Sequence, residues 1–226
     1  MLLKDKINFT YKELVENGPI NIVVFGDSIT HGALNGEYDY DTVYWNLLRK
    51  KINALRDYTP VNVINSGVAG TTATASVERL ERDVLSHHPD LIIICFGLND
   101  VIGALESYKK SLKTIFEKCK AQCEQVIFLT PNMLNTYVAE DISENLKDFA
   151  KTTAEYQNSG RVDIFIDSAR AIAKECGVTV CDAYARWKEM YVNGEDTTKL
   201  LCNKINHPTK EMHNLFADML FDIIMK

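Results

Sequence analysis

Ser28 is placed where a serine could act as a nucleophile. It lies in the segment GDSIT (residues 26–30), directly after the apolar run Ile20–Phe25. A short run rich in β-branched residues is typical of a buried strand. Sheets of α/β proteins carry their reactive groups just beyond the carboxyl ends of their strands. A serine alcohol becomes reactive once a neighbouring base takes its proton, so the chain must bring a base to Ser28.

His207 is the candidate base. It lies in the loop segment Asn206-His207-Pro208 rather than on a predicted helix face, and histidine changes its charge near neutral pH. An isolated loop histidine is more often structural, so this prediction depends on the residues that accompany it. The remaining histidines fit a helix end, a pocket lining and the closing helix, and they are His87 with His88, His31, and His213.

The residues that follow neighbouring strands could bind a developing oxyanion. Asn99 offers a side-chain NH₂ after the run Leu91–Phe96, and Gly67 offers an unobstructed backbone N–H after Val61–Asn65. The backbone N–H of Ser28 points into the same region if the serine begins a helix. Taken singly, Gly67 fits a turn and Asn99 fits a helix cap. Their joint occurrence, each after a strand, predicts an oxyanion hole.

Apolar runs predict the elements that position these residues. Those typical of buried strands are Ile20–Phe25, Val61–Asn65, Leu91–Phe96, Gln125–Leu129 and Val178–Cys181. Those with helical spacing are Tyr44–Leu55, Val77–Leu85, Leu105–Cys119, Val138–Tyr156, Ile164–Ala173 and Leu215–Met225. Near-continuous apolar strands are typical of parallel sheets that are covered on both faces. The alternation of strands and helices predicts an α/β protein, a three-layer α/β/α sandwich.

Composition narrows the class of protein. The chain has 226 residues, of which 46% are hydrophobic and 25% are charged, as in an ordinary soluble domain. No linker rich in Pro, Gly and Ser interrupts it, so we expect a single domain over residues 1–226. The net charge of −6 gives no basic footprint, so no nucleic-acid partner is expected.

The amino-terminal segment and the cysteines bear on the compartment. Residues Met1–Glu16 carry charges throughout and lack the apolar stretch of a signal peptide. No segment approaches the ~20 apolar residues needed to span a bilayer. The six cysteines form no Cys-x-x-Cys pair, and we expect them to be reduced thiols. These features predict a cytoplasmic protein with no membrane partner.

Taken together, the short motifs around these residues resemble the conserved sequence blocks of the SGNH hydrolase superfamily, also called GDSL esterases and lipases. The matching blocks are Gly26-Asp27-Ser28, Asn65-Ser66-Gly67 with the following Gly70, Gly97-Leu98-Asn99-Asp100, and His207. The resemblance implies a flavodoxin-like fold with a mostly parallel five-stranded sheet. It implies ester hydrolysis through an acyl-enzyme, without a metal or an organic cofactor. It also implies Ser28 as nucleophile, with the oxyanion held by Ser28, Gly67 and Asn99.

One position departs from the family pattern. Family members usually carry Asp three residues before the histidine, where this chain has Lys204; some carry it one place earlier, at Asn203. An amide can orient an imidazole but supplies no charge to stabilise the imidazolium. Asn203 could orient a working dyad, which is the interpretation we adopt. Alternatively a carboxylate such as Asp182 or Asp196 replaces the acid, or the enzyme is slow.

The sequence says less about the substrate. No long apolar lid is evident, so we expect a small-molecule ester with a short acyl or acetyl group. Aromatic residues after the serine could stack on a sugar, as in a carbohydrate acetylesterase, or pack in the core; they are Tyr38, Tyr40, Tyr44 and Trp45. The alternative hypothesis is a non-catalytic or weakly active ligand-binding protein that retains the fold, consistent with Lys204.

Overall fold

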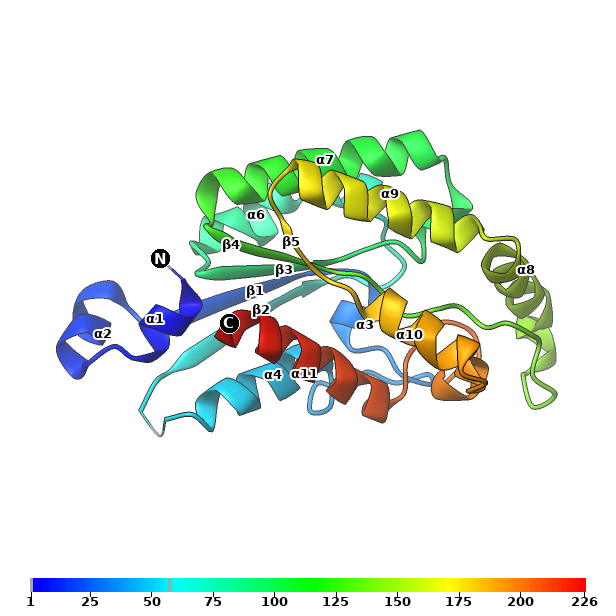
Figure 1. Ribbon diagram of the computed structural model, residues 1–226, viewed down its shortest axis with the longest axis horizontal. Helices are drawn as coiled ribbons and strands as arrows, with labels where there is room; N and C mark the ends of the chain where they lie inside the picture. The colour runs from blue at the N-terminus through cyan, green and yellow to red at the C-terminus, as the bar shows by residue number, and fades with distance from the viewer. Residues whose placement is uncertain (1, 57) are drawn as a thin grey trace.

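Five parallel strands form the centre of the molecule (Figure 1). The computed structural model describes residues 2–56 and 58–226. The strand order is β2-β1-β3-β4-β5, and every neighbouring pair is parallel. The strands are β1 (Ile20–Gly26), β2 (Val61–Gly67), β3 (Leu91–Cys95), β4 (Gln125–Leu129) and β5 (Thr179–Cys181). This order is that of flavodoxin-like folds, so the predicted sheet is confirmed.

Helices cover both faces of the sheet, which explains why the strands are apolar along their whole length. On one face lie α4 (Tyr44–Asn53) and α11 (Lys210–Met225), and on the other lie α7 (Leu105–Gln122) and α9 (Arg161–Glu175) (Figure 1). Every residue of β3 is buried, because its side chains alternate between the two helical layers. The predicted three-layer arrangement is confirmed.

The shorter elements lie at the two ends of the sheet. Helices α1 (Leu3–Ile7) and α2 (Tyr11–Asn17) lie beyond the amino ends of the strands, whereas α8 (Lys147–Asn158) and α10 (Ala183–Val192) lie toward the carboxyl ends (Figure 1). The remaining helical turns are α3 (Ser28–His31), α5 (Ala73–Ser76), α6 (Leu80–Asp83), η1 (Leu85–His87), η2 (Asp100–Ile102), η3 (Glu144–Leu146) and η4 (Thr197–Leu200). Of these turns, α3, α5 and η2 follow β1, β2 and β3 respectively, where the active site was predicted.

Two of the predicted helices differ from the structure, and α10 was not predicted. The predicted helix Val138–Tyr156 begins only at Lys147, because the apolar residues before it pack as a loop against Ile205. The predicted helix Val77–Leu85 is broken into α6 and η1. Helix α10 was missed, although Asp182 caps it and its buried residues recur at helical spacing.

None of the helices in the described part of the chain is long and apolar enough to cross a membrane.

Candidate active site

The carboxyl end of β1 presents Ser28 to His207. Ser28 is the first residue of the short helix α3, and the carboxylate of Asp27 caps that helix by accepting the Ile29 N–H at 3.0 Å. The Oγ of Ser28 lies 3.0 Å from Nε2 of His207, although 179 positions separate the two residues in the chain. The structure therefore brings the candidate nucleophile and the candidate base within reach of one proton.

A main-chain carbonyl fixes the tautomer of His207. The Nδ1 atom of the ring lies 3.3 Å from the carbonyl oxygen of Leu34. We assign the proton to Nδ1, because a carbonyl can only accept, and because the Asn203 NH₂ group, 3.4 Å from Nδ1, already donates to Asn206 at 2.7 Å. Nε2 is then unprotonated and accepts the hydroxyl of Ser28. This is the tautomer that a general base requires.

Burial favours the neutral form of His207. Desolvation lowers the pKa of His207 below its ordinary value, and the hydrogen bond to the Leu34 carbonyl offsets part of that effect. The neutral imidazole is the form that can take a proton from Ser28. The ring is therefore in its basic form at neutral pH.

Asn203 holds the loop that carries His207, but it does not accept the ring proton. Its Oδ1 accepts three backbone N–H groups, those of Ile205, Asn206 and His207, at 3.0 to 3.1 Å. These three donors fix which end of the amide is oxygen. Its Nδ2 donates to Asn206 and lies 3.4 Å from Nδ1 of His207. Asn203 thus orients the imidazole through the main chain, and Leu34 supplies the acceptor.

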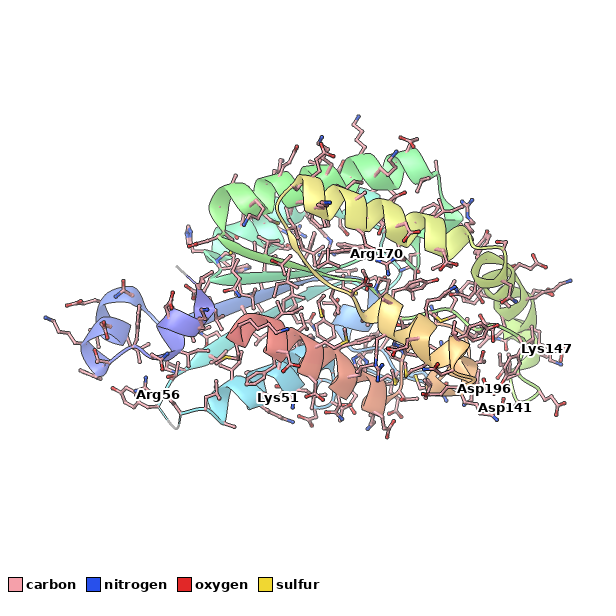
Figure 2. All side chains as sticks on the ribbon, viewed as in Figure 1. Lys51, Arg56, Asp141, Lys147, Arg170 and Asp196 are labelled. Carbon is pink, nitrogen blue, oxygen red and sulfur yellow. The ribbon has the colours of Figure 1, made fainter. Side chains whose placement is uncertain are left out.

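The two carboxylates considered as substitutes for the missing acid are engaged elsewhere. Asp182 binds Arg170 of α9 at 2.7 and 3.0 Å and caps α10. Asp196 accepts the hydroxyl of Tyr137 at 2.8 Å and caps η4. Figure 2 labels Arg170 and Asp196 at separate places around the carboxyl end of the sheet. The described partners of His207 Nδ1 are Leu34 and Asn203 alone.

Asn99 lies beside the serine, as its place after β3 predicts. Its Nδ2 donates to the carbonyl of Thr71 at 3.0 Å and lies 3.4 Å from a carboxylate oxygen of Asp27. These contacts connect the segments that follow β1, β2 and β3. The Ser28 N–H, at the start of α3, has no acceptor within residues 2–56 and 58–226. The Ser28 N–H is therefore free to donate, and of the two Asn99 amide hydrogens the one at 3.4 Å from Asp27, longer than an ordinary hydrogen bond, is the one that a substrate oxygen could take.

Gly67, predicted as an oxyanion donor, has another role in this structure. Its N–H donates to the side-chain oxygen of Asn65 at 3.0 Å. A Cβ at Gly67 would lie 2.4 Å from the backbone nitrogen of His31. The glycine is therefore needed because α3 packs directly on the end of β2, and its N–H is occupied. The geometry does not support the predicted donor role.

Gly70 is the residue that sequence reasoning passed over. It has φ of +78°, nothing lies within 4 Å of where its Cβ would be, and its N–H has no acceptor in the described chain. Gly70 directly precedes Thr71, whose carbonyl binds Asn99. A left-handed backbone favours glycine, and this turn leaves a free donor beside Asn99. The signal was present, since Gly70 belongs to the same block as Gly67.

Two buried carboxyl groups support this part of the site. Burial raises the pKa of Asp27 to about 7, and the nearby Asp100 adds to the rise. Burial also raises the pKa of Asp100 to about 7, and one of its oxygens accepts the Ala73 N–H at 2.9 Å. Because of this burial, both groups change charge near neutral pH.

The remaining histidines lie outside the proton-transfer pair. His213 is a buried residue of α11, and its Nδ1 accepts the N–H of Tyr44, the first residue of α4, at 3.3 Å. His31 follows Ser28 on α3 and contacts Tyr38 and Tyr40. His87 and His88 are exposed at the end of η1. None of these four rings contacts the Oγ of Ser28 in the described structure.

Residues 24–215 match the GDSL-like lipase/acylhydrolase family. The chain belongs to this family, a class of ester-hydrolysing enzymes, and the resemblance drawn from the sequence blocks is confirmed. One curated relative, the uncharacterized lipoprotein YqeF of Bacillus subtilis (strain 168), is 30% identical over 101 residues. That match covers 43% of this chain and 39% of YqeF, so the chain spans well under half of that relative.

Solved structures share the fold over nearly the whole chain. The acetylxylan esterase Axe2 from Geobacillus stearothermophilus is 21% identical, with a TM-score of 0.68 over 91% of this chain and 94% of Axe2. LAE5, an alpha/beta hydrolase enzyme from the metagenome of Lake Arreo, Spain, is also 21% identical, with a TM-score of 0.69 over 92% and 96% of the two chains. At this identity the likeness establishes the architecture.

Proposed function

We propose that this protein hydrolyses short-chain acyl esters, acetyl esters above all, through an acyl-enzyme on Ser28. The observation that carries this proposal is the 3.0 Å contact between Ser28 Oγ and His207 Nε2. The fixed tautomer of His207 makes Nε2 the acceptor in that contact. Family membership supports the reaction type.

The proposed reaction has two halves. Ser28 Oγ attacks the ester carbonyl while its proton passes to Nε2 of His207. His207 then gives that proton to the leaving alcohol, and the acyl group stays on Ser28. Water attacks the acyl-enzyme in the second half, its proton passing to Nε2 and then back to Ser28 as the carboxylic acid leaves.

The oxyanion of each tetrahedral intermediate is held by three donors. These are the Ser28 N–H, the Asn99 side-chain amide and, in place of Gly67, the Gly70 N–H. Donors already aimed at the developing charge lower the barrier, because they need no reorganisation during the reaction. The Thr71 carbonyl positions the Asn99 amide by accepting one of its hydrogens at 3.0 Å, and the oxyanion takes the other hydrogen in place of its long 3.4 Å contact with Asp27.

Acetylated carbohydrates are the substrate class that we favour. Similar solved structures include acetylxylan esterases, and exposed aromatic side chains follow the nucleophile. The alternative, a binding protein without catalysis, was motivated by the missing acid. The Leu34 carbonyl weakens that alternative, because it supplies the acceptor that His207 needs.

The replacement Ser28→Ala tests the proposal. We expect the wild-type protein to hydrolyse p-nitrophenyl acetate and to be labelled by a fluorophosphonate probe. The variant should lose both properties and keep the wild-type melting temperature, since it removes one small hydroxyl. Turnover that persists in Ser28→Ala, or a wild-type protein that neither turns over nor labels, would show that Ser28 is not a nucleophile.

A further inference from the structure

Aromatic rings form a row beside the nucleophile. The ring of His31 lies 4.2 Å from that of Tyr38 and 6.2 Å from that of Tyr40, centroid to centroid. Tyr40 in turn lies 6.5 Å from Trp45. Tyr44, considered with these residues from the sequence, is fully buried and does not belong to the row. Tyr38 ends the row, and 52% of this residue is exposed to solvent.

Polar contacts position the side chains of His31, Tyr40 and Trp45. The hydroxyl of Tyr40 lies 3.2 Å from Nε2 of His31, and the indole N–H of Trp45 donates to the Thr30 carbonyl at 2.8 Å. Tyr38 pairs with Ala33 in an antiparallel bridge. An exposed side chain that is already fixed loses little conformational freedom when a ligand packs on it. Tyr38 therefore has the properties of a binding surface.

The row is also close to the reacting centre. His31 follows Ser28 by three positions on α3, so the two side chains share one face of that turn. Tyr38 closes the hairpin 33–38, whose Leu34 carbonyl contacts His207. A group bound on Tyr38 thus lies beside an ester that is positioned at Ser28. The exposed carboxylates of Glu37 and Asp41 flank these rings in sequence and can accept hydrogen bonds from the hydroxyls of a ligand.

We propose that Tyr38, backed by His31, is a subsite that stacks the pyranose ring of an acetylated sugar while its acetyl ester is cleaved at Ser28. One face of the Tyr38 ring is covered by His31, which leaves the other for a ligand. A pyranose offers a face of C–H groups to an aromatic ring and hydroxyls to flanking carboxylates. This inference rests on the proposed ester hydrolysis and specifies the alcohol part of its substrate.

The test compares two acetyl esters on one set of variants. Xylose tetraacetate carries a pyranose ring, and ethyl acetate carries no ring. Hydrolysis of each is followed by pH-stat titration. For Tyr38→Ala, we expect kcat/KM on the sugar ester to fall roughly 10-fold relative to ethyl acetate, about 1.4 kcal/mol, mainly through a higher KM. Tyr38→Phe keeps the ring and should keep the wild-type ratio.

The control is Tyr11→Ala, which removes an exposed tyrosine from α2 at the opposite end of the sheet. It should leave both rates unchanged. An unchanged ratio in Tyr38→Ala, with ethyl acetate still cleaved, would overturn the subsite and leave the proposed function standing. An equal fall for both esters would also overturn it, since Tyr38 would then act only by supporting the hairpin. A wild-type protein that cleaves neither ester would overturn both proposals.

Discussion

The ring of His207 spans the distance between a hydroxyl and a peptide carbonyl: Nε2 lies 3.0 Å from Ser28 Oγ, and Nδ1 lies 3.3 Å from the Leu34 oxygen. A carbonyl fixes the tautomer as a carboxylate would, but it brings a dipole rather than a full negative charge. The imidazolium that forms during the reaction is therefore less stabilised than in a triad with an acid. We expect an active enzyme whose kcat rises when a negative charge is supplied next to His207.

Replacing Asn203 by Asp should accelerate the enzyme. One oxygen of the new carboxylate would keep the three backbone N–H bonds, and the other would take the place of Nδ2, 3.4 Å from Nδ1 of His207. The Asn206 amide would turn to donate to it. A hydrogen bond to a charged partner contributes ~1.5–3 kcal/mol, so we expect kcat for p-nitrophenyl acetate to rise roughly 10-fold or more.

The matched control for this gain is Asn193→Asp. It adds the same charge at an exposed position after α10 and should leave kcat unchanged. If Asn203→Asp and Asn193→Asp give the same rate, a carboxylate at 203 does not reach the imidazole, and the idea that charge limits this enzyme is wrong.

The pH profile should report the buried state of His207. The neutral ring is the base, so kcat/KM rises with pH as His207 loses its proton. Because burial lowers the pKa of His207, half of the maximum should be reached below pH 6.5. An NMR titration of the His207 ring should give the same midpoint, and Asn203→Asp should move both midpoints upward. A wild-type NMR midpoint of the His207 ring above pH 6.5 would contradict the burial of the ring.

Two glycines should respond differently to substitution. In Gly67→Ala the new Cβ would meet the backbone of His31 at 2.4 Å, so we expect a loss of stability of about 2–3 kcal/mol. In Gly70→Ala nothing obstructs the Cβ, but φ of +78° is strained for alanine, which displaces the N–H. We expect a folded protein whose kcat falls by up to roughly 100-fold.

Thermal melts and kinetics on both variants separate the two roles. A well-folded Gly70→Ala enzyme with wild-type kcat would remove Gly70 from the oxyanion hole. A Gly67→Ala protein that keeps its stability but loses kcat would restore the role predicted for Gly67 from the sequence.

The sequence predicts the pairing of Ser28 with His207 because parallel strands bring their carboxyl ends to one edge. The acceptor of the His207 proton could not be predicted in this way. Leu34 acts through its main-chain carbonyl, and any residue type at that position carries the same group. The sequence also could not show that the Gly67 N–H is occupied, since this depends on where the Asn65 side chain turns.

Some helices could likewise be predicted from the sequence, and others could not. The spacing of apolar residues predicts α7 and α9, which pack on the sheet over several turns. It fails for Val138–Tyr156, because apolar residues of a loop can pack against Ile205 without forming a helix. Helix α10 carries both a capping residue and the right spacing, so the sequence does contain the signals that predict this helix.

His213 should make stability depend on pH. Desolvation lowers its pKa to about 4, while an unfolded histidine titrates near 6.5. Between these pH values the unfolded chain binds the proton more readily than the folded protein does. The contribution of His213 to the free energy of unfolding is therefore fully present above pH 6.5 and is lost as pH falls toward 4. From pH 7 to pH 5 we expect this contribution to fall by about 2 kcal/mol.

The variant His213→Asn should reduce that dependence. Its side-chain oxygen can still accept the Tyr44 N–H that Nδ1 binds at 3.3 Å, but it does not titrate. Urea unfolding at pH 5 and pH 7 should show lower stability at both values, since the ring contacts with Tyr44 and Phe216 are lost, and a smaller difference between them. The control is His88→Asn, because His88 is exposed and its left-handed backbone suits asparagine; it should keep the wild-type difference. If His213→Asn also keeps that difference, the buried ring is not what makes stability fall in acid.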